Sequence, residues 1–541
     1  MRYKLRFVII SLLLLVSVIF ILGYFWLPSP KSIDKGSFSS LRAARDIEVI
    51  SREPHSLDNP EERDKVRRYL AERLTGIGYK TQTEFYDTIG NVYASLSPLN
   101  FNDTGRCTYV LLMAHLDSRH AYKVNGVTHY SLGAADDGYG LGVILELAAN
   151  ALKYRDNWNQ GVKIIFTDGE EKGLYGIKAV LNFKEEFFHN VGLIINIEAR
   201  GIKGPALLFE TSPGNSRIVE LFKKASIPAG YSFSSYVYGI LPNYTDFSLI
   251  KDDYPGMNFA VIDNLDFYHT EYDNYDNISL SSIQHYGEQI APVIQSYLTQ
   301  LKYSDLDYLR EGSDIIYFSI PIIGLVSLSK HVYITFNIIV LISYIINLVI
   351  VIRRKSISSG KFFRGMLFIS GMFFLAAIIG HGFSYILSVI NGVNYKFIAL
   401  AHLKYDSALV LISLIILIGT YAWLYSRIIA SKWSEILELQ LSAELFLITL
   451  AFISILLTNE NFFILIPIVF SIISRWSPHS GWKWIVITTL SILLLLITVP
   501  FIHTVYLALY NGALSIVLIL CFVVLVALLP HIHRVSLKLV K

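Results

Sequence analysis

The sequence predicts an α/β domain fused to an all-α polytopic transmembrane domain, and two observations support this fold class. Most of the Asp, Glu, Gly and Asn residues lie between about residues 30 and 310, whereas Ile, Leu, Val and Phe dominate from about residue 330 onward. In the first region, short apolar runs alternate with helical patterns. That alternation is typical of a mainly parallel mixed sheet with helices on both faces.

The overall composition favours a membrane protein and argues against a nucleic-acid partner. The 541 residues are 53% hydrophobic and only 16% charged, which is too apolar for an ordinary soluble domain. The net charge of +3 is small, and the cations gather in short loops between apolar runs, as membrane topology requires. Cys107 and Cys521 lie in different regions, so we expect neither a disulfide framework nor a thiolate zinc site.

The N-terminal stretch predicts a transmembrane anchor over residues 1–29. Basic residues precede about 20 apolar ones, a length that spans a bilayer. A cleaved signal peptide is the alternative. No small-x-small cleavage site precedes Leu27, which favours an uncleaved anchor.

Seven further apolar runs predict a transmembrane domain of about seven helices over residues 332–541. They lie near 332–352, 365–391, 406–428, 437–457, 460–474, 483–503 and 511–530. Cation-rich loops alternate with loops nearly free of cations, so the positive-inside rule gives about eight spans, cytoplasmic N- and C-termini and an extracytoplasmic domain over residues 30–310. That location is the cell surface in a bacterium and a lumen in a eukaryote. The proline-broken apolar stretch in residues 311–331 is expected to be an interfacial linker.

Few ionisable residues lie in or beside the predicted spans. They include His381, His402, Lys404 and Asp406. Intramembrane charges are functional candidates, but positions near span ends favour an interfacial role. Transport by this domain is a disfavoured alternative because its charge is so sparse.

The α/β region contains five apolar runs that predict strands and four patterns that predict helices. The strands are expected at 109–114, 162–167, 192–199, 205–210 and 257–262, and the helices at 60–76, 140–154, 216–226 and 281–302. Active sites of parallel sheets gather at the carboxyl ends of the strands. Polar residues that follow the strands are therefore candidates for a functional site.

Two motifs follow the first predicted strand. In "HLDSR", Asp117 is placed to hold the second ring nitrogen of a metal-bound His115, although a His at a strand end is more often a polar turn residue. In "GAADDGYG", Asp136 and Asp137 open the helix that follows. A helix cap and a metal ligand are equally compatible with this second motif alone.

Three further motifs complete the set. "FTDGEE" places Glu170 and Glu171 after the second strand, "NIEARG" places Glu198 at the end of the third, and "DFYHTEYDN" places Tyr268 and His269 after the last. Two imidazoles and several carboxylates, with no thiolate, suit a pair of zinc ions bridged by one carboxylate. Such a pair activates water for hydrolysis, and a spare glutamate can act as the general base.

These five motifs, in this order, resemble the co-catalytic dizinc aminopeptidases, the family of the secreted bacterial leucyl aminopeptidases. The resemblance covers roughly residues 40–302 and extends to the membrane-bound branch, which includes vacuolar membrane protease and endoplasmic reticulum metallopeptidase. Glu198 stands where secreted members carry Asp, as in that branch. The resemblance implies two Zn²⁺ ions as cofactors and a zinc peptidase domain over residues 30–310.

The resemblance also implies roles for individual residues. Glu170 is the expected general base, Tyr268 the expected oxyanion partner, and Asp117 the residue behind His115. The implied metal ligands are His115, Asp136, Glu171, Glu198 and His269, with Asp136 as the bridge. Asp137 is the residue after the bridge, often joined to it by a cis peptide in this family, and Arg200 and Asp246 are supporting residues without assigned roles.

The function implied is that of a membrane-anchored metallo-aminopeptidase that removes N-terminal residues from peptide substrates outside the cytoplasm. A glutaminyl cyclase-like or carboxypeptidase-like zinc enzyme on the same fold is the alternative. A non-catalytic receptor or assembly module is a further one, disfavoured by the complete set of ligands and base. The expected partners are peptides and the lipid bilayer, and no oligomeric state is implied.

Overall fold

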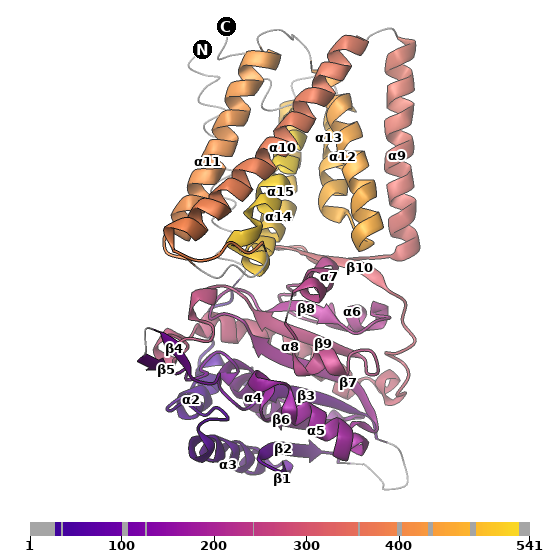
Figure 1. Cartoon of the computed structure of the whole chain (residues 1–541). Coiled ribbons are helices and arrows are strands. Elements are labelled where there is room, and N and C mark those ends of the chain that lie inside the picture. The colour runs from indigo at the N-terminus through magenta and orange to yellow at the C-terminus, as the bar shows by residue number, and fades with distance from the viewer. Residues whose placement is uncertain are drawn as a thin grey trace. The chain divides into compact units, whose positions relative to one another are not determined.

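A computed structural model describes most of the chain in two compact units (Figure 1). The described residues are 27–33, 36–99, 107–124, 127–241, 243–354, 357–397, 403–430, 436–476 and 483–529. One unit runs from Phe25 to Lys330, and the other contains the helices after His331. The anchor expected at residues 1–29 lies almost wholly outside the described residues and stays a prediction.

The first unit is built on a seven-stranded mixed sheet with the order β1-β2-β6-β3-β7-β9-β8. The strands are β1 (Lys80–Tyr86), β2 (Ile89–Leu96), β3 (Tyr109–His115), β6 (Gly161–Thr167), β7 (Val191–Ala199), β8 (Leu207–Thr211) and β9 (Gly256–Val261). The four central strands, β6, β3, β7 and β9, are parallel, and the outer pairings are antiparallel. The predicted fold class is confirmed, and all five predicted strands are present.

Two of these strands escape the sequence patterns. β1, with the sequence "KTQTEFY", lies at the edge of the sheet and is largely exposed. A half-solvated strand alternates polar and apolar residues instead of forming an apolar run. β1 is therefore missed by a search for apolar runs. β2 is mostly buried, but Gly90 and Asn91 interrupt its apolar residues, so it is missed as well.

Helices cover both faces of the sheet (Figure 1). They are α2 (Ser40–Ile50), α3 (Pro60–Ile77), α4 (Gly138–Ala151), α5 (Tyr175–Phe183), α6 (Ser216–Phe222), α7 (Ser232–Ile240) and α8 (Leu280–Thr299). The main core lies under α2, α3, α4, α6 and α8, and a smaller core on the other face lies under α5. Successive residues of β3 alternate between the two, because Leu111 belongs to the smaller core and Leu112 to the main one.

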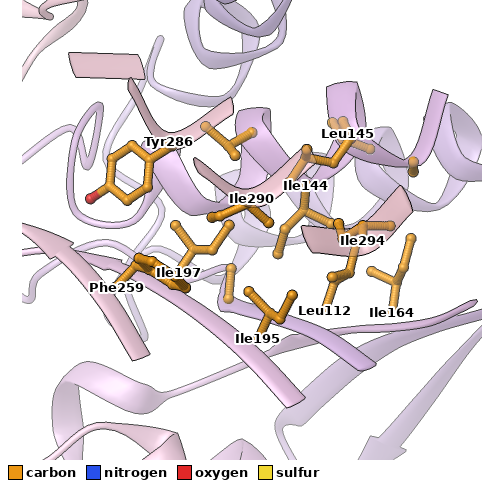
Figure 2. Close-up of a cluster of buried hydrophobic side chains, with 14 of the residues drawn as sticks. Leu112, Ile144, Leu145, Ile164, Ile195, Ile197, Phe259, Tyr286, Ile290 and Ile294 are labelled. Atoms are coloured by element: carbon orange, nitrogen blue, oxygen red, sulfur yellow. The ribbon is translucent and has the colours of Figure 1, made fainter. Parts of the chain in front are cut away.

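The main core holds the parallel strands in place (Figure 2). Leu112 of β3, Ile164 of β6 and Ile195 of β7 point toward Ile144 of α4 and Ile290 of α8, and all five side chains are fully buried. Burial of each such side chain stabilises the fold by about 1.5–3 kcal/mol. The carboxyl ends of these strands are thereby fixed relative to one another.

The segment expected to be an interfacial linker, residues 311–331, contains an antiparallel hairpin of β10 (Ile315–Ile320) and β11 (Gly324–Ser329). Pro321, which breaks the apolar run, occupies the turn, where proline is favoured. The Ser319 N–H donates to the Gly230 carbonyl, so the hairpin is joined to the first unit. That unit extends to Lys330, and the interfacial position expected for residues 311–331 stays a prediction.

Among its described residues, the second unit contains seven apolar helices, each at the place of a predicted span. They are α9 (Lys330–Arg353), α10 (Ser359–Ile390), α11 (Asp406–Leu424), α12 (Leu437–Thr458), α13 (Phe462–Trp476), α14 (Lys483–Leu509) and α15 (Leu514–Ala527). Within the described residues, five helical segments are long and apolar enough to cross a membrane, and two more are shorter. The count of about eight spans and the cytoplasmic termini stay predictions.

The charged residues of the second unit include the candidates from the sequence and one further pair. Lys404 and Asp406 lie at the start of α11, and His402 is outside the described residues. A different pair is buried between helices: Arg475 of α13 donates to Glu444 of α12 at 2.8 Å. Neither residue stood out in the sequence, because Arg475 lies at the end of its apolar run and Glu444 shares its run with Glu438.

Candidate metal centre

The residues expected to form a site come from the carboxyl ends of the parallel strands. His115 ends β3, and Glu198 is the penultimate residue of β7. Glu170 and Glu171 open a short 3₁₀ helix after β6, and His269 follows β9. Because parallel strands end at the same edge of a sheet, these side chains converge.

Three ligand atoms meet at one point of this edge. His269 Nε2 lies 3.1 Å from Asp136 Oδ2 and 3.0 Å from Glu171 Oε1. All three atoms are buried and, within the described part of the chain, none has a hydrogen-bond partner. A buried polar atom without a partner is costly. These residues therefore fit a cation held between them.

A second group adjoins the first through Asp136. His115 Nε2 lies 3.3 Å from Asp136 Oδ1 and 3.7 Å from Glu198 Oε2. His115 Nδ1 is 2.9 Å from the Asp117 carbonyl oxygen, which leaves Nε2 to face the group. Asp136 thus directs one carboxylate oxygen toward each imidazole, as a carboxylate between two cations would.

The next residue, Asp137, also lies close to His115 and Glu198, but its carboxylate accepts hydrogen bonds from backbone N–H groups. Its ligand atoms fall within 4.8 Å of those of His115 and Glu198. However, the Gly140 N–H donates to Oδ1 at 3.0 Å, and the His115 N–H donates to Oδ2 at 3.3 Å. We therefore interpret Asp137 as the cap of α4 and Asp136 as the residue shared by the two groups. The peptide bond between them is cis.

Asp117 connects two of the loops. Its carboxylate accepts hydrogen bonds from the Glu170 N–H at 3.0 Å and from the Glu171 N–H at 3.4 Å. The same residue contacts His115 through its carbonyl oxygen. The sequence placed Asp117 behind the imidazole only. In the structure it also fixes the turn that presents the two glutamates.

Glu170 does not belong to either ligand group but faces the same space. Desolvation raises the pKa of its carboxyl well above the usual range, and the negative charges of Glu198 and Glu171 raise it further. Burial likewise raises the pKa of Glu198 to about 8. Bound cations would favour the ionised form of both groups. A general base must take up and release a proton near the working pH, and a carboxylate with a raised pKa can do so.

Tyr268 stacks on the imidazole of His269. Their ring centroids are 3.6 Å apart and their planes differ by 23°. Burial raises the pKa of the Tyr268 phenol well above its usual range, and the charges of Asp136 and Glu171 add to this effect. The hydroxyl therefore stays protonated and can donate a hydrogen bond at this edge.

Asp246 lies beside the site and is only partly satisfied. The Thr167 hydroxyl donates to its Oδ2, whereas the buried Oδ1 has no partner in the described ranges. Burial raises the pKa of Asp246 to about 6. Arg200 follows β7 directly, and its charge acts on Tyr268.

Two residues of the site were missed by the sequence analysis. Asp273 accepts hydrogen bonds from the Ala135 N–H at 2.6 Å and from the Asp136 N–H at 3.3 Å, and so joins the loop of Asp136 to that of His269. Arg119 forms an ion pair with Glu171 at 2.8 Å. Both residues lie within motifs named above, HLDSR and DFYHTEYDN, but their hydrogen-bond partners are distant in the sequence.

An α/β sheet whose carboxyl edge brings imidazoles and carboxylates together defines the class of α/β metallohydrolases. Residues 91–294 match the model for Peptidase family M28. Residues 91–294 therefore resemble an M28 peptidase domain, and the relatives named below include metallopeptidases.

The chain is similar to membrane proteases over part of its length. It is 28% identical to endoplasmic reticulum metallopeptidase 1 of Rattus norvegicus over 356 residues, 63% of this chain and 37% of that protein. The mouse (Mus musculus) protein is 30% identical over 243 residues, 43% and 25% of the two chains. Vacuolar membrane protease of Schizosaccharomyces pombe is 26% identical over 301 residues, which cover 52% of this chain and 34% of that protein. The matches thus span about a third of these relatives or less.

Solved structures similar to this chain include the Legionella pneumophila LapA aminopeptidase. It is 14% identical with a TM-score of 0.39, over 49% of this chain and 73% of that one. A Zn-dependent exopeptidase from Parabacteroides distasonis is 18% identical with a TM-score of 0.37, over 49% and 99% of the two chains.

Proposed function

We propose that this protein is a membrane-anchored dizinc aminopeptidase whose catalytic unit lies outside the cytoplasm. The observation that supports it best is the convergence of three buried ligand atoms, from Asp136, Glu171 and His269, that have no hydrogen-bond partner among the described residues. The adjoining pair of His115 and Glu198 shares Asp136 with them.

The two groups would each hold one zinc ion. His115 and Glu198 would bind the first, Glu171 and His269 the second, and Asp136 would contribute an oxygen to each. Imidazole and carboxylate ligands suit zinc, and both cysteines of the chain are free and take no part. When bound, two zinc ions would polarise the scissile carbonyl and lower the pKa of a water molecule beside them.

The protein's own groups would move the protons and orient the reactants. Glu170 would accept a proton from the attacking water and return it to the leaving amine. Its backbone is fixed for this role by Asp117. Tyr268, held protonated by burial, would donate a hydrogen bond to the oxygen on which negative charge develops.

The charge balance of the site favours substrates with a free amino terminus. Asp117, Asp136, Asp137, Glu170, Glu171 and Glu198 lie at this edge of the sheet. When ionised, these six carboxylates would exceed the four positive charges of two zinc ions. The remaining negative potential attracts an ammonium group, which an acetylated peptide lacks.

The test uses the full chain in nanodiscs, with zinc analysis and peptides that have free or acetylated N-termini. We expect zinc in the purified protein and release of N-terminal residues from free peptides alone. Glu170→Gln should keep the zinc and lower kcat by about 10²–10⁴-fold. Full activity of zinc-loaded Glu170→Gln would contradict the mechanism. Cyclisation of N-terminal glutamine would instead support the glutaminyl cyclase-like alternative.

A further inference from the structure

Arg119 places a positive charge at the edge of the candidate metal centre. Its Nη1 donates to Glu171 Oε2 at 2.8 Å and to the Glu171 carbonyl oxygen at 3.3 Å. The Arg119 side chain is 30% exposed, whereas that of Glu171 is 6% exposed. Arg119 therefore has one end at the site and remains partly exposed to solvent.

Most hydrogen-bond donors of this guanidinium are unused. Arginine carries five N–H donors in a planar fork. Only Nη1 makes hydrogen bonds, and in the described part of the chain Nε and Nη2 have no protein partner. The charge of Asp136 acts on Arg119 as well. The unused donors thus lie close to the groups that would hold the reacting bond.

Two other basic groups near this edge are already paired. Lys172 Nζ lies 3.6 Å from Asp58, and His129 Nδ1 lies 2.7 Å from Glu271. Arg119, by contrast, has spare donors beside an otherwise acid-rich site. Such a group lowers the cost of bringing an anion close to the surrounding carboxylates.

We propose that Arg119 recognises a substrate carboxylate adjacent to the scissile bond, which makes it a specificity-determining residue. A guanidinium is the side chain best matched to a carboxylate, because its fork forms charge-assisted and often bidentate hydrogen bonds. The carboxylate is either the free C-terminus of a dipeptide or the side chain of an N-terminal acidic residue. The inference rests on the proposed aminopeptidase function and adds the substrate class.

A purely structural role for Arg119 has a different signature. If Arg119 only held Glu171 in place, its removal would weaken zinc binding and lower turnover of every substrate by the same factor. Recognition of a carboxylate instead changes the ratio between matched substrates with and without that group. The ratio of kcat/KM values, mainly through KM, therefore separates the two roles.

The experiment compares wild type, Arg119→Gln and Arg119→Lys as full chains loaded with zinc in nanodiscs. One arm uses Leu-Gly and Leu-Gly-amide, and the other uses the aminocoumarin derivatives of Glu and Gln. We expect wild type to prefer the carboxylate about 10–100-fold in one arm, in line with charged hydrogen bonds. Arg119→Gln should bring that ratio near one, and Arg119→Lys should retain part of it. Lys172→Gln, at the neighbouring paired cation, should keep the wild-type ratio.

Equal losses on both members of each substrate pair in Arg119→Gln, or no preference in wild type, would overturn the proposal. A binding measurement separates its failure from that of the proposed function. Titration of zinc-loaded Glu170→Gln with Leu-Gly and its amide needs no turnover. If zinc-loaded wild type shows no peptidase activity but this titration shows a preference that Arg119→Gln abolishes, carboxylate recognition is supported and the aminopeptidase is contradicted.

Discussion

Both units of this protein bury carboxylates, but they pair them differently. In the helical unit, Glu444 Oε1 accepts from Ser471 at 2.9 Å and Oε2 accepts from Arg475 at 2.8 Å. At the edge of the sheet, Asp136 Oδ2 and Glu171 Oε1 have no donor among the residues the structure describes. Because burial without a partner is costly, the first arrangement, in which both oxygens of Glu444 have donors, needs no ligand at this carboxylate. The second requires a ligand.

The largest effect should follow from Glu171→Ala, which removes a ligand atom without a partner. Zinc affinity should fall by more than about a hundredfold, beyond the loss typical of outer-shell partners. Peptidase activity should fall at least roughly a thousandfold, because the lost cation supplies several kcal/mol of transition-state stabilisation. Zinc titration and kcat/KM measure the two effects. An unchanged zinc content would break the contrast drawn between the two units.

Glu444→Gln should have the opposite profile. It leaves the charge of Arg475 buried without its partner, which costs about 3–5 kcal/mol of stability. Zinc content should not change. Thermal unfolding in detergent measures the loss, and Arg475→Gln in the same chain should recover part of it, as expected for a coupled pair. Loss of zinc from Glu444→Gln would mean that the buried pair also serves the metal centre.

Asp246 is intermediate between the two cases, since one of its oxygens has a donor and the other does not. Its pKa is raised by burial to about 6, above about 3.9 for an unfolded chain. The folded state therefore binds the proton more tightly, and the resulting stability, ~3 kcal/mol, is complete below about pH 4 and lost as pH rises through about 6. Asp246→Asn should flatten this part of the profile.

The measurement for Asp246 is thermal unfolding of the chelator-treated protein between pH 4 and 7. The wild type should become less stable across this window, and Asp246→Asn should change less. If the variant follows the wild-type profile, the carboxyl of Asp246 is not protonated in the folded state and its half-paired geometry has another origin.

The smallest effect is expected for Asp273→Ala. This change removes acceptors from the Ala135 and Asp136 N–H groups but no proposed ligand. Zinc affinity should fall about 10–100-fold, as for other outer-shell partners. Asp266→Asn, at an exposed position of the same loop, is the control and should bind zinc as wild type does. Equal affinities in the two variants would remove Asp273 from the support of the centre.

The sequence could predict the central strands and the candidate ligands for the same physical reason. A buried parallel strand is an apolar run, so the polar residue that ends it, such as His115, stands out. The pair of Asp136 and Asp137 could not be resolved in this way, since both follow glycine-rich turns. Only the hydrogen bond from Gly140 distinguishes the cap from the shared residue.

Contacts between distant segments were not predictable from local patterns. Arg119 pairs with Glu171, and Asp273 holds the backbone of Asp136, across 52 and 137 residues of sequence. The buried pair of Glu444 and Arg475 joins two apolar helices in the same way. Each of these residues is an unremarkable polar position until the fold brings its partner near.

Metal analysis of wild type and Asp136→Asn tests the central claim most directly. The account predicts two zinc ions per purified chain and fewer than one in Asp136→Asn, with the helical unit and the sheet still folded by circular dichroism. Asp136 is the residue that directs an oxygen to each imidazole. Two zinc ions retained in Asp136→Asn, or a folded wild type that binds none, would contradict a shared carboxylate between two metals.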